Sequence, residues 1–276
     1  MPLTHAQRQS LERELPRAVR FDDLTRQLYA TDASIYQVEP LAVAFPKSPD
    51  DTSKLVRACG EAGVPLISRG AGTGLSGGAI GEGVIADFSR FNRGVSGFDP
   101  ERRTIHVEAG VVLDQLNAFL KPQGLCFGPD VATSSRATLG GMIANNSSGA
   151  RAPVYGATID HVESLDVVLA DGRAATIGSG GDTFGDLFER ATTLICAREA
   201  EVRARLPVGI VKRWPGYGFE RWFRNGPGLM QLLGGSEGTL ACITGATLRL
   251  APLPQRKSVG VLFFDSVAEA MTATVA

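Results

Sequence analysis

The sequence has few of the residues that build disulfide frameworks or metal clusters. Its four cysteines are widely separated, at Cys59, Cys126, Cys196 and Cys242. They form no Cys-x-x-Cys pair, which excludes a cysteine-based zinc framework. The three histidines are scattered too, and the spacing of nucleophiles and carboxylates around them builds no triad. We expect mostly buried thiols in a reducing compartment, and no metal site.

Net charge and long hydrophobic runs are also missing. The 28 basic and 29 acidic side chains leave a formal net charge of −1, so no global field gathers nucleic acid or an anionic membrane. No run approaches the roughly 18 apolar residues of a membrane span, and the N-terminus lacks the apolar core of a secretory signal. We expect a cytoplasmic protein without a membrane span, and peripheral association with the inner membrane stays open.

Basic and aromatic residues mix in the range 198–224. Such mixtures bind single-stranded nucleic acid in some proteins. Because the whole chain is nearly neutral, we interpret this range instead as a packing or partner surface. The sequence therefore predicts no nucleic-acid partner.

The remaining composition is typical of a globular protein with one large domain or about two. The chain has 276 residues, 43% of them hydrophobic and 21% charged, and a domain has roughly 150 residues. Residues 6–29 and 183–205 show helical periodicity. A further helix should begin at Ser48, because serine caps helices and Pro49 suits the first turn.

Several short apolar runs predict strands. A hairpin should join 163–170 to 173–177 through an Asp-Gly turn of type I′. Strands are also expected at the following ranges: 41–45, 64–68, 84–88, 103–108, 240–250 and 259–264. Alternation of strands with helices predicts α/β layers. The helical pattern after residue 264 reaches residue 276 without a cap, and we interpret the chain as truncated, with 256–276 as the start of a cap or substrate domain.

Glycine is in excess: it makes up 33 of the 276 residues, about 12%, whereas ~7% is typical. The stretch SRGAGTGLSGGAIGEG at 68–83 holds a Gly-x-Gly-x-x-Gly pattern. The nicotinamide-binding version of this pattern needs a helix directly after the glycines and an acidic residue about 20 residues further on. Here a strand follows, and 92–98 read NRGVSGF. We therefore reject a nicotinamide site.

The same glycines suit an anion or a cofactor. Successive glycine N–H groups can form a concave anion nest, and the missing Cβ lets a pyrophosphate approach the backbone. Arg69, Thr73 and Ser76 could add side-chain donors. The alternative is a flexible surface turn, which the two flanking apolar strands disfavour.

A second polar stretch, 128–156, reads GPDVATSSRATLGGMIANNSSGARAPVYG. Hardly any of its side chains is large enough to build a core. Long loops of this kind are uncommon in compact domains unless they are functional. Its hydroxyl, amide and backbone donors suit a flat heteroaromatic ring with many acceptors.

Four ordered motifs resemble one family: RGAGTGLSGG, PDVATSSRATLGGMIANNSSGA, YGATIDHVESLDVVLADG and GGSEGTLACITGATLRL. The chain resembles the FAD-binding domain of the vanillyl-alcohol oxidase / p-cresol methylhydroxylase (PCMH) superfamily, and within it the D-lactate, glycolate and D-2-hydroxyglutarate dehydrogenases. The resemblance implies an α+β fold. A PCMH-type FAD-binding domain at 36–255 would comprise two α/β subdomains, about 36–95 and 96–255, with FAD between them and a helical lead-in at 1–35.

The resemblance also implies which residues bind FAD. The pyrophosphate would lie against Arg69, Gly70, Ala71, Gly72, Thr73, Gly74, Leu75, Ser76, Gly77 and Gly78. The flavin and ribityl region would be lined by Pro129, Asp130, Thr133, Ser134, Gly140, Gly141, Asn145, Ser148, Gly149 and Tyr155. The adenine-ribose end would meet Glu237, Gly238 and Ile243. Thr73 stands where covalently flavinylated relatives carry histidine, so we expect non-covalent FAD.

The implied activity is that of an FAD-dependent oxidoreductase acting on CH–OH groups. It would move a hydride from a small 2-hydroxy acid to FAD, and a quinone, a cytochrome or an electron-transfer flavoprotein would accept the electrons. The catalytic base, and any iron–sulfur cluster or divalent metal, would belong to a region beyond residue 276, so we assign no catalytic residue and expect this portion to be inactive alone. Two alternatives remain: a non-catalytic flavin-binding electron-transfer subunit, and another flavoenzyme of the superfamily.

Overall fold

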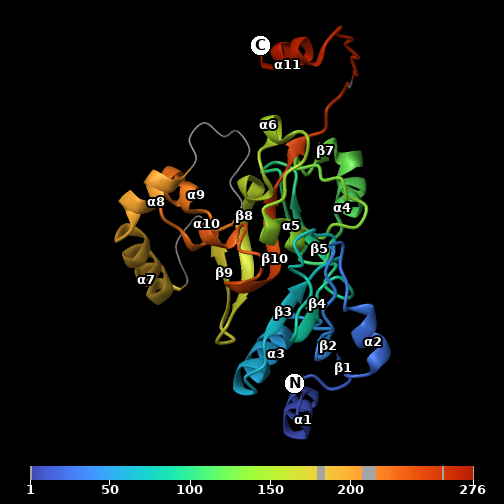
Figure 1. Cartoon of the computed structure of the whole chain (residues 1–276), viewed down its shortest axis with the longest axis vertical. Helices are drawn as coiled ribbons and strands as arrows, with labels where there is room; N and C mark the ends of the chain where they lie inside the picture. Colours follow the sequence, from blue (N-terminus) through green and yellow to red (C-terminus); the bar gives the residue numbers. More distant parts are fainter. Residues whose placement is uncertain (1, 179–183, 207–215, 257, 276) are drawn as a thin grey trace.

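Two β-sheets with helices packed on them form the body of the protein (Figure 1). The computed structural model describes residues 2–178, 184–206, 216–256 and 258–275. Residues 207–215, part of the basic and aromatic range, and residue 183 of the expected second helix lie outside the described residues. The mixture of helices and sheets agrees with the predicted α+β class.

The first sheet comes from the N-terminal part of the chain. Its strands are arranged in the order β1 (Val19–Arg20), β2 (Ala42–Ala44), β4 (Val84–Asp87) and β3 (Leu66–Arg69). Strands β2, β4 and β3 are parallel, while β1 pairs antiparallel with β2 at one edge. Helix α3 (Pro49–Glu61) connects β2 to β3. The expected strands are therefore confirmed, and the glycine-rich stretch links two parallel strands of this sheet.

Helix α3 begins where the sequence predicts. The Ser48 hydroxyl accepts a hydrogen bond from the Asp51 N–H at 3.1 Å, and Pro49 occupies the first turn. Residues Leu55 and Cys59 of its inner face are buried.

Replacing the Ser48 cap is expected to destabilise the protein. In Ser48→Ala the Asp51 N–H loses its acceptor, which should lower the free energy of unfolding by about 1 kcal/mol. Urea unfolding followed by circular dichroism measures this change. Ser48→Asp keeps a capping oxygen and serves as the control, and equal losses in both variants would contradict the capping role.

Residues 6–29 do not form the single helix that their periodicity predicts. They contain α1 (His5–Glu14), strand β1 and α2 (Asp23–Leu28). Pro16 follows α1, and Arg17 adopts a left-handed φ of 62°, which a continuing helix cannot contain. Helix α1 packs against α3, with Leu11 fully buried.

The second sheet is antiparallel. Its strands are arranged in the order β5 (Val95–Asp99), β6 (Thr104–Glu108), β10 (Ala241–Arg249), β8 (Val162–Leu169) and β9 (Ala174–Gly178). Helices α4 (Leu113–Leu120) and α5 (Leu139–Asn145) contribute buried side chains to its core. Strands β7 (Leu125–Cys126) and β11 (Ala251–Pro252) form a small ribbon beside it. The central strand, β10, is thus the last of the five along the chain.

The β8–β9 hairpin is confirmed, but its turn is not of type I′. That type requires positive φ at both central residues, whereas Gly172 has a φ of 80° and Asp171 is not among the positive-φ residues. The Leu169 N–H donates to the Arg173 carbonyl and the Gly172 N–H donates to the Leu169 carbonyl, both at 2.9 Å. The hairpin therefore closes with a three-residue loop ending in a left-handed glycine.

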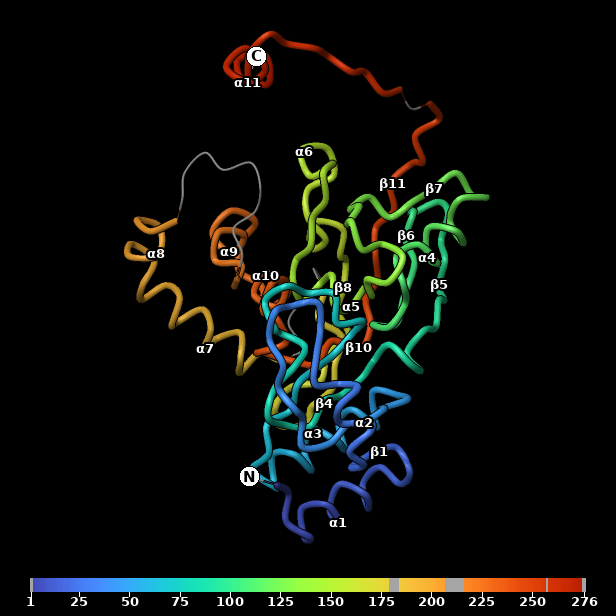
Figure 2. Tube along the Cα trace, turned by 45° about the vertical axis from the view of Figure 1, so that its right-hand side comes forward, coloured from blue at the N-terminus to red at the C-terminus, as the bar shows by residue number. Residues whose placement is uncertain are grey.

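A group of helices lies to one side of the second sheet in Figures 1 and 2. It comprises α7 (Gly185–Cys196), α8 (Glu199–Arg205), α9 (Phe219–Asn225) and α10 (Leu229–Leu233). The predicted helix at 183–205 is thus divided between α7 and α8. A small core of Ile195, Trp222 and Leu232 joins α7, α9 and α10.

The two sheets share part of their hydrophobic core. One buried cluster contains Cys59 of α3 and Ala86 of β4 together with Val168 of β8 and Cys242 of β10. The Arg57 guanidinium donates to the Gly172 carbonyl at 3.3 Å, across the same junction. The sheets are therefore held in a fixed relation. No described helix is long and apolar enough to cross a membrane.

The C-terminal segment runs away from the body in both views (Figures 1 and 2). Helix α11 (Val267–Val275) is confirmed, but the strand predicted at 259–264 is wrong. The described part of the chain offers this segment no pairing strand, and Val259 and Phe263 are 92% and 90% exposed. An extended apolar segment becomes a strand only when a neighbour accepts its hydrogen bonds.

Candidate functional site

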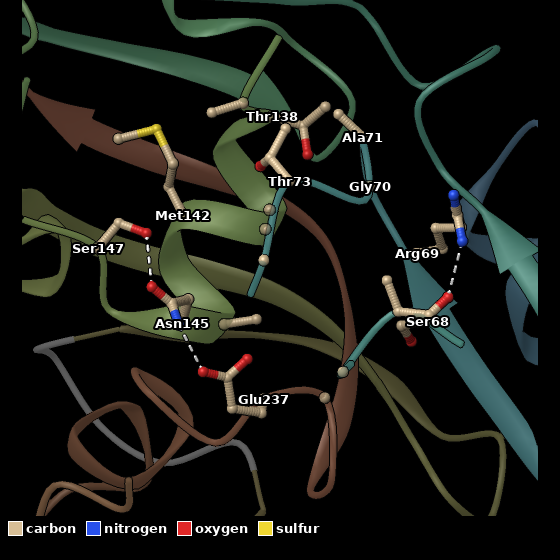
Figure 3. Close-up of a pocket in the computed structure, with 18 of the residues that line it drawn as sticks. Ser68, Arg69, Gly70, Ala71, Thr73, Thr138, Met142, Asn145, Ser147 and Glu237 are labelled. Carbon is tan, nitrogen blue, oxygen red and sulfur yellow. Dashed lines mark hydrogen bonds between the residues drawn. The ribbon is translucent and has the colours of Figure 1, made fainter. Parts of the chain in front are cut away.

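A cavity of about 750 Å³ lies between the glycine-rich loop and the second sheet. Its walls are the loop after β3, helix α5 with the segment after it, and the start of β10. Figure 3 shows Gly70 and Thr73 of the loop, Thr138 and Asn145 around α5, and Glu237 on these different walls. The volume lies within the roughly 300–1,000 Å³ of small-molecule and cofactor sites.

The glycine-rich loop owes its shape to a few specific positions. Gly72 and Gly77 have φ of +65° and +76°, a left-handed conformation that favours glycine. The Ala33 N–H donates to the Gly72 carbonyl at 2.9 Å and anchors the loop to the N-terminal segment. Gly74 lines the cavity, and a Cβ placed on it would meet no atom within 4 Å. The absent side chain at Gly74 therefore leaves space for a ligand.

Arg69 ends β3 and faces the backbone of neighbouring segments. Its Nη1 donates to the carbonyl of Ala79 at 3.0 Å and to that of Tyr29 at 3.5 Å. Its Nη2 donates to the carbonyl of Thr31 at 2.9 Å. Burial lowers the pKa of the Arg69 guanidinium. Three of the five guanidinium N–H groups therefore serve the protein backbone.

Thr138 carries an unpaired buried hydroxyl at the cavity. It precedes α5, yet its side chain makes no capping hydrogen bond. The residue is 2% exposed, and its Oγ1 has no partner among the described residues. A Cβ on Gly70 would collide with Oγ1, and one on Gly141 would approach it to 3.2 Å. Since an unpaired buried hydroxyl is costly, a ligand that bonds to it would gain affinity.

Asn145 and Glu237 are linked at the cavity wall, where Glu237 Oε2 lies 3.7 Å from the Cβ position of Gly78. The Asn145 Nδ2 donates to Glu237 Oε1 at 2.6 Å, and the Ser147 hydroxyl donates to Asn145 Oδ1 at 2.9 Å (Figure 3). Glu237 has a left-handed φ of 53°, and its N–H donates to the Ala144 carbonyl at 2.9 Å. The segment before β10 is therefore fixed against the end of α5.

Most residues that the sequence predicts for the site line this cavity. From the loop these are Arg69, Gly70, Ala71, Gly72, Thr73, Gly74, Leu75, Ser76 and Gly78; from the other walls they are Thr133, Gly140, Gly141, Asn145, Ser148, Glu237, Gly238 and Ile243. The structure therefore brings together three segments that are far apart in the sequence.

The other predicted residues lie outside the cavity lining: Gly77, Pro129, Asp130, Ser134, Gly149 and Tyr155. Gly77 faces the Tyr36 ring, 3.0 Å from where its Cβ would be. Arg151 Nε forms an ion pair with Asp130 Oδ2 at 3.3 Å. The Asp130 carbonyl oxygen lies so close to Gly149 that a Cβ on Gly149 could not fit. The Ser134 backbone carbonyl accepts a hydrogen bond from the Asp114 N–H.

Sequence reasoning missed several lining residues: Ser68, Ala79, Phe88, Ala109, Val131, Ala137, Thr138, Met142, Ala144, Asn146, Ser147 and Ala241. Most are small or apolar, without a functional signature. Thr138 directly precedes an apolar helical turn, where threonine normally indicates a cap. Only the structure reveals that its hydroxyl faces the cavity instead.

Histidines and cysteines contribute little to this site. His161 Nε2 bonds to the Tyr155 carbonyl at 2.7 Å, and His106 lies 3.4 Å from Asp166. Burial raises the pKa of Cys59 to about 12, and Cys242 nearby adds to the shift. Two of the four cysteines, Cys59 and Cys242, are buried, whereas Cys126 is partly exposed and Cys196 is exposed, so the expectation of mostly buried thiols holds only for half of them. No group of three or more potential metal ligands occurs among the described residues.

The cavity fits the FAD that the sequence resemblance implies. The open space at Gly74, which a side chain would fill, gives room for the cofactor. The unpaired Thr138 hydroxyl can form a hydrogen bond with it. Arg69 and Glu237 are the charged residues of the described lining. Since Arg69 bonds backbone carbonyls, backbone N–H groups and neutral hydroxyls are the donors that would meet a pyrophosphate.

Comparisons with known proteins agree with this geometry. The sequence model of the family described as "FAD binding domain" matches residues 40–178. A D-2-hydroxyglutarate dehydrogenase of Pantoea ananatis is 37% identical over 88% of this chain and 25% of its own length. A D-lactate dehydrogenase of Archaeoglobus fulgidus is 34% identical over 94% of this chain and 48% of its own. The chain thus spans about a quarter to a half of these relatives.

A solved alkyldihydroxyacetonephosphate synthase shares the fold. It superposes with a TM-score of 0.66 and 21% identity, covering 93% of this chain and 42% of the synthase. At that identity the likeness shows a common fold alone.

Proposed function

We propose that this chain, which belongs to the FAD-binding domain family, is the flavin-binding portion of a D-2-hydroxyacid dehydrogenase of the D-lactate, glycolate or D-2-hydroxyglutarate type. The cavity at the junction of the two sheets carries the proposal, because it joins an open glycine cradle to an unpaired buried hydroxyl. The D-2-hydroxyglutarate and D-lactate dehydrogenases among its relatives support the substrate class.

The residues of this chain would bind and orient the cofactor. We propose that N–H groups of the loop at 70–78 and the Thr138 hydroxyl meet the pyrophosphate, and that the Asn145–Glu237 pair meets neutral hydroxyl groups at the other end. Glu237 Oε2 lies 3.7 Å from the Cβ position of Gly78, at the end of the loop, so we place the phosphates nearer to Gly70–Gly74, where repulsion between like charges is weaker. FAD, when bound, supplies the chemistry of accepting a hydride from a carbon that bears a hydroxyl.

We further propose the division of the protein. The FAD-binding domain would occupy 36–255, with subdomains at about 36–95 and 96–255, a lead-in at 1–35 and the start of a cap domain at 256–276. A 2-hydroxy acid would be the electron donor, and a quinone, a cytochrome or an electron-transfer flavoprotein the acceptor.

The decisive experiment uses the full-length protein from which this portion derives. Loaded with FAD under anaerobic conditions, it should lose flavin absorbance on addition of D-lactate, glycolate or D-2-hydroxyglutarate, and should respond to neither L-lactate nor L-2-hydroxyglutarate. Binding of FAD without bleaching by any 2-hydroxy acid would leave the flavin-binding role intact and overturn the dehydrogenase.

The mode of FAD attachment gives a separate prediction. Thr73, at the cavity wall, offers no imidazole for a flavin linkage, so the FAD should be non-covalent. Protein loaded with FAD and precipitated with acid should leave the yellow colour in the supernatant. A yellow pellet that survives washing would show a covalent bond.

A further inference from the structure

We propose that Arg69 is a positioning residue, which holds the glycine-rich loop in its binding shape and leaves its charge unused by the cofactor phosphates. The inference rests on the proposed function, because it concerns FAD in the cavity. It departs from the role that the sequence resemblance implies for this residue.

The hydrogen bonds of Arg69 connect the two ends of the loop to the N-terminal segment. Ala79 lies at the end of the loop, while Tyr29 and Thr31 lie some 40 residues before Arg69. A Cβ on Gly72 would lie 2.8 Å from Nη2, so the loop backbone packs directly over the guanidinium. The planar guanidinium reaches several acceptors in fixed directions, which the single ammonium of lysine cannot reproduce.

A second layer fixes the guanidinium. Its central carbon lies 5.1 Å from the centre of the Tyr29 ring. The Tyr29 hydroxyl donates to Asp87 Oδ2 at 2.5 Å, and the Ser89 N–H donates to Asp87 Oδ1 at 2.6 Å. Asp87 is 4% exposed. The Tyr29 ring that contacts Arg69 is therefore itself fixed by a hydrogen bond to the end of β4. This arrangement holds the guanidinium, and with it the loop, in one position.

FAD affinity should respond differently to salt and to a lysine at position 69, depending on whether Arg69 binds phosphate or positions the loop. A guanidinium bound to phosphate would make FAD affinity fall with ionic strength, and lysine would largely replace it. If the guanidinium bonds carbonyls instead, the groups that donate to the phosphates are the neutral loop N–H groups and the Thr138 hydroxyl. FAD affinity should then be nearly independent of salt, and lysine should fail.

The test compares Arg69→Lys and Arg69→Met with the wild type in FAD titrations followed by flavin fluorescence, at about 50 mM and about 500 mM NaCl. Both variants should lose about tenfold in affinity, with the same flat salt dependence as the wild type. Guanidinium ion at millimolar concentration should restore part of the affinity of Arg69→Met, and methylammonium should not. Arg173→Lys, distant from the cavity lining, is the matched control.

Hydrogen–deuterium exchange of the FAD-free proteins gives an independent readout. Exchange should rise at 29–33 and 70–79 in both Arg69 variants, with the β8–β10 region unchanged. Wild-type affinity in Arg69→Lys, together with a salt dependence that disappears in Arg69→Met, would overturn the inference. If the wild type binds no FAD, the proposed function fails, and unchanged exchange at 70–79 would then overturn the positioning role separately.

Discussion

Gly74→Val is expected to lower FAD affinity by more than about 100-fold while the protein stays folded. The free protein should tolerate the side chain, because Gly74 is outside the left-handed region and a Cβ would meet no atom within 4 Å. In the complex the valine would occupy the space of the ligand beside the loop. A loss of 100-fold corresponds to about 2.7 kcal/mol of binding free energy.

Equilibrium titration with FAD and thermal unfolding together measure this prediction. Gly60→Val is the matched control, since Gly60 lies on α3 outside the cavity lining and a Cβ there also meets no atom within 4 Å. Gly72 would be a poorer choice, because its positive φ and its contact with Arg69 would strain the loop itself. Unchanged FAD affinity in Gly74→Val would exclude the loop as the pyrophosphate site.

Thr138→Val is expected to weaken FAD binding without lowering the stability of the FAD-free protein. Valine keeps the shape of threonine and removes a hydroxyl that has no partner among the described residues, so the FAD-free protein should be as stable as the wild type or slightly more stable. If the hydroxyl bonds a phosphate oxygen, its loss should weaken FAD binding by about 1.5–3 kcal/mol, or roughly 10- to 150-fold.

Thr52→Val provides the matched control for Thr138. Thr52 is also buried, but its hydroxyl donates to the Ser48 carbonyl at 3.0 Å, on α3. That variant should lose stability and keep its FAD affinity. If Thr138→Val instead lost stability without losing FAD affinity, the hydroxyl would serve the protein and not the ligand.

Local signals predicted much of the fold. The Ser48–Pro49 start of α3 and the strands around the glycine loop are confirmed because a helix cap and a short apolar run are each encoded within a few residues. The periodic pattern at 6–29 was misleading, since a break at Pro16 and Arg17 outweighs periodicity on both sides. Residues 259–264 show the opposite limit: a strand pattern alone does not form a strand where no neighbouring strand pairs with it.

Site residues could be predicted from the sequence where their role depends on residue type alone. They could not be predicted where the role depends on contacts with residues from other segments of the chain. Gly74 could be found from the glycine pattern. The partners of Arg69 could not, because Tyr29 and Thr31 come from another segment and offer only backbone carbonyls. Thr138 was missed for a related reason: its sequence position indicates a helix cap, and only packing against Gly70 and Gly141 directs the hydroxyl elsewhere.

The late position of β10 also has a consequence for biosynthesis. Strands β6 and β8 flank β10 on both sides, so neither has its central neighbour until residues 241–249 leave the ribosome, and such long-range pairing is slow to form. The same stretch brings Glu237, Gly238 and Ile243 to the cavity. Until then the nascent chain carries an incomplete cofactor pocket, so FAD loading follows the insertion of β10.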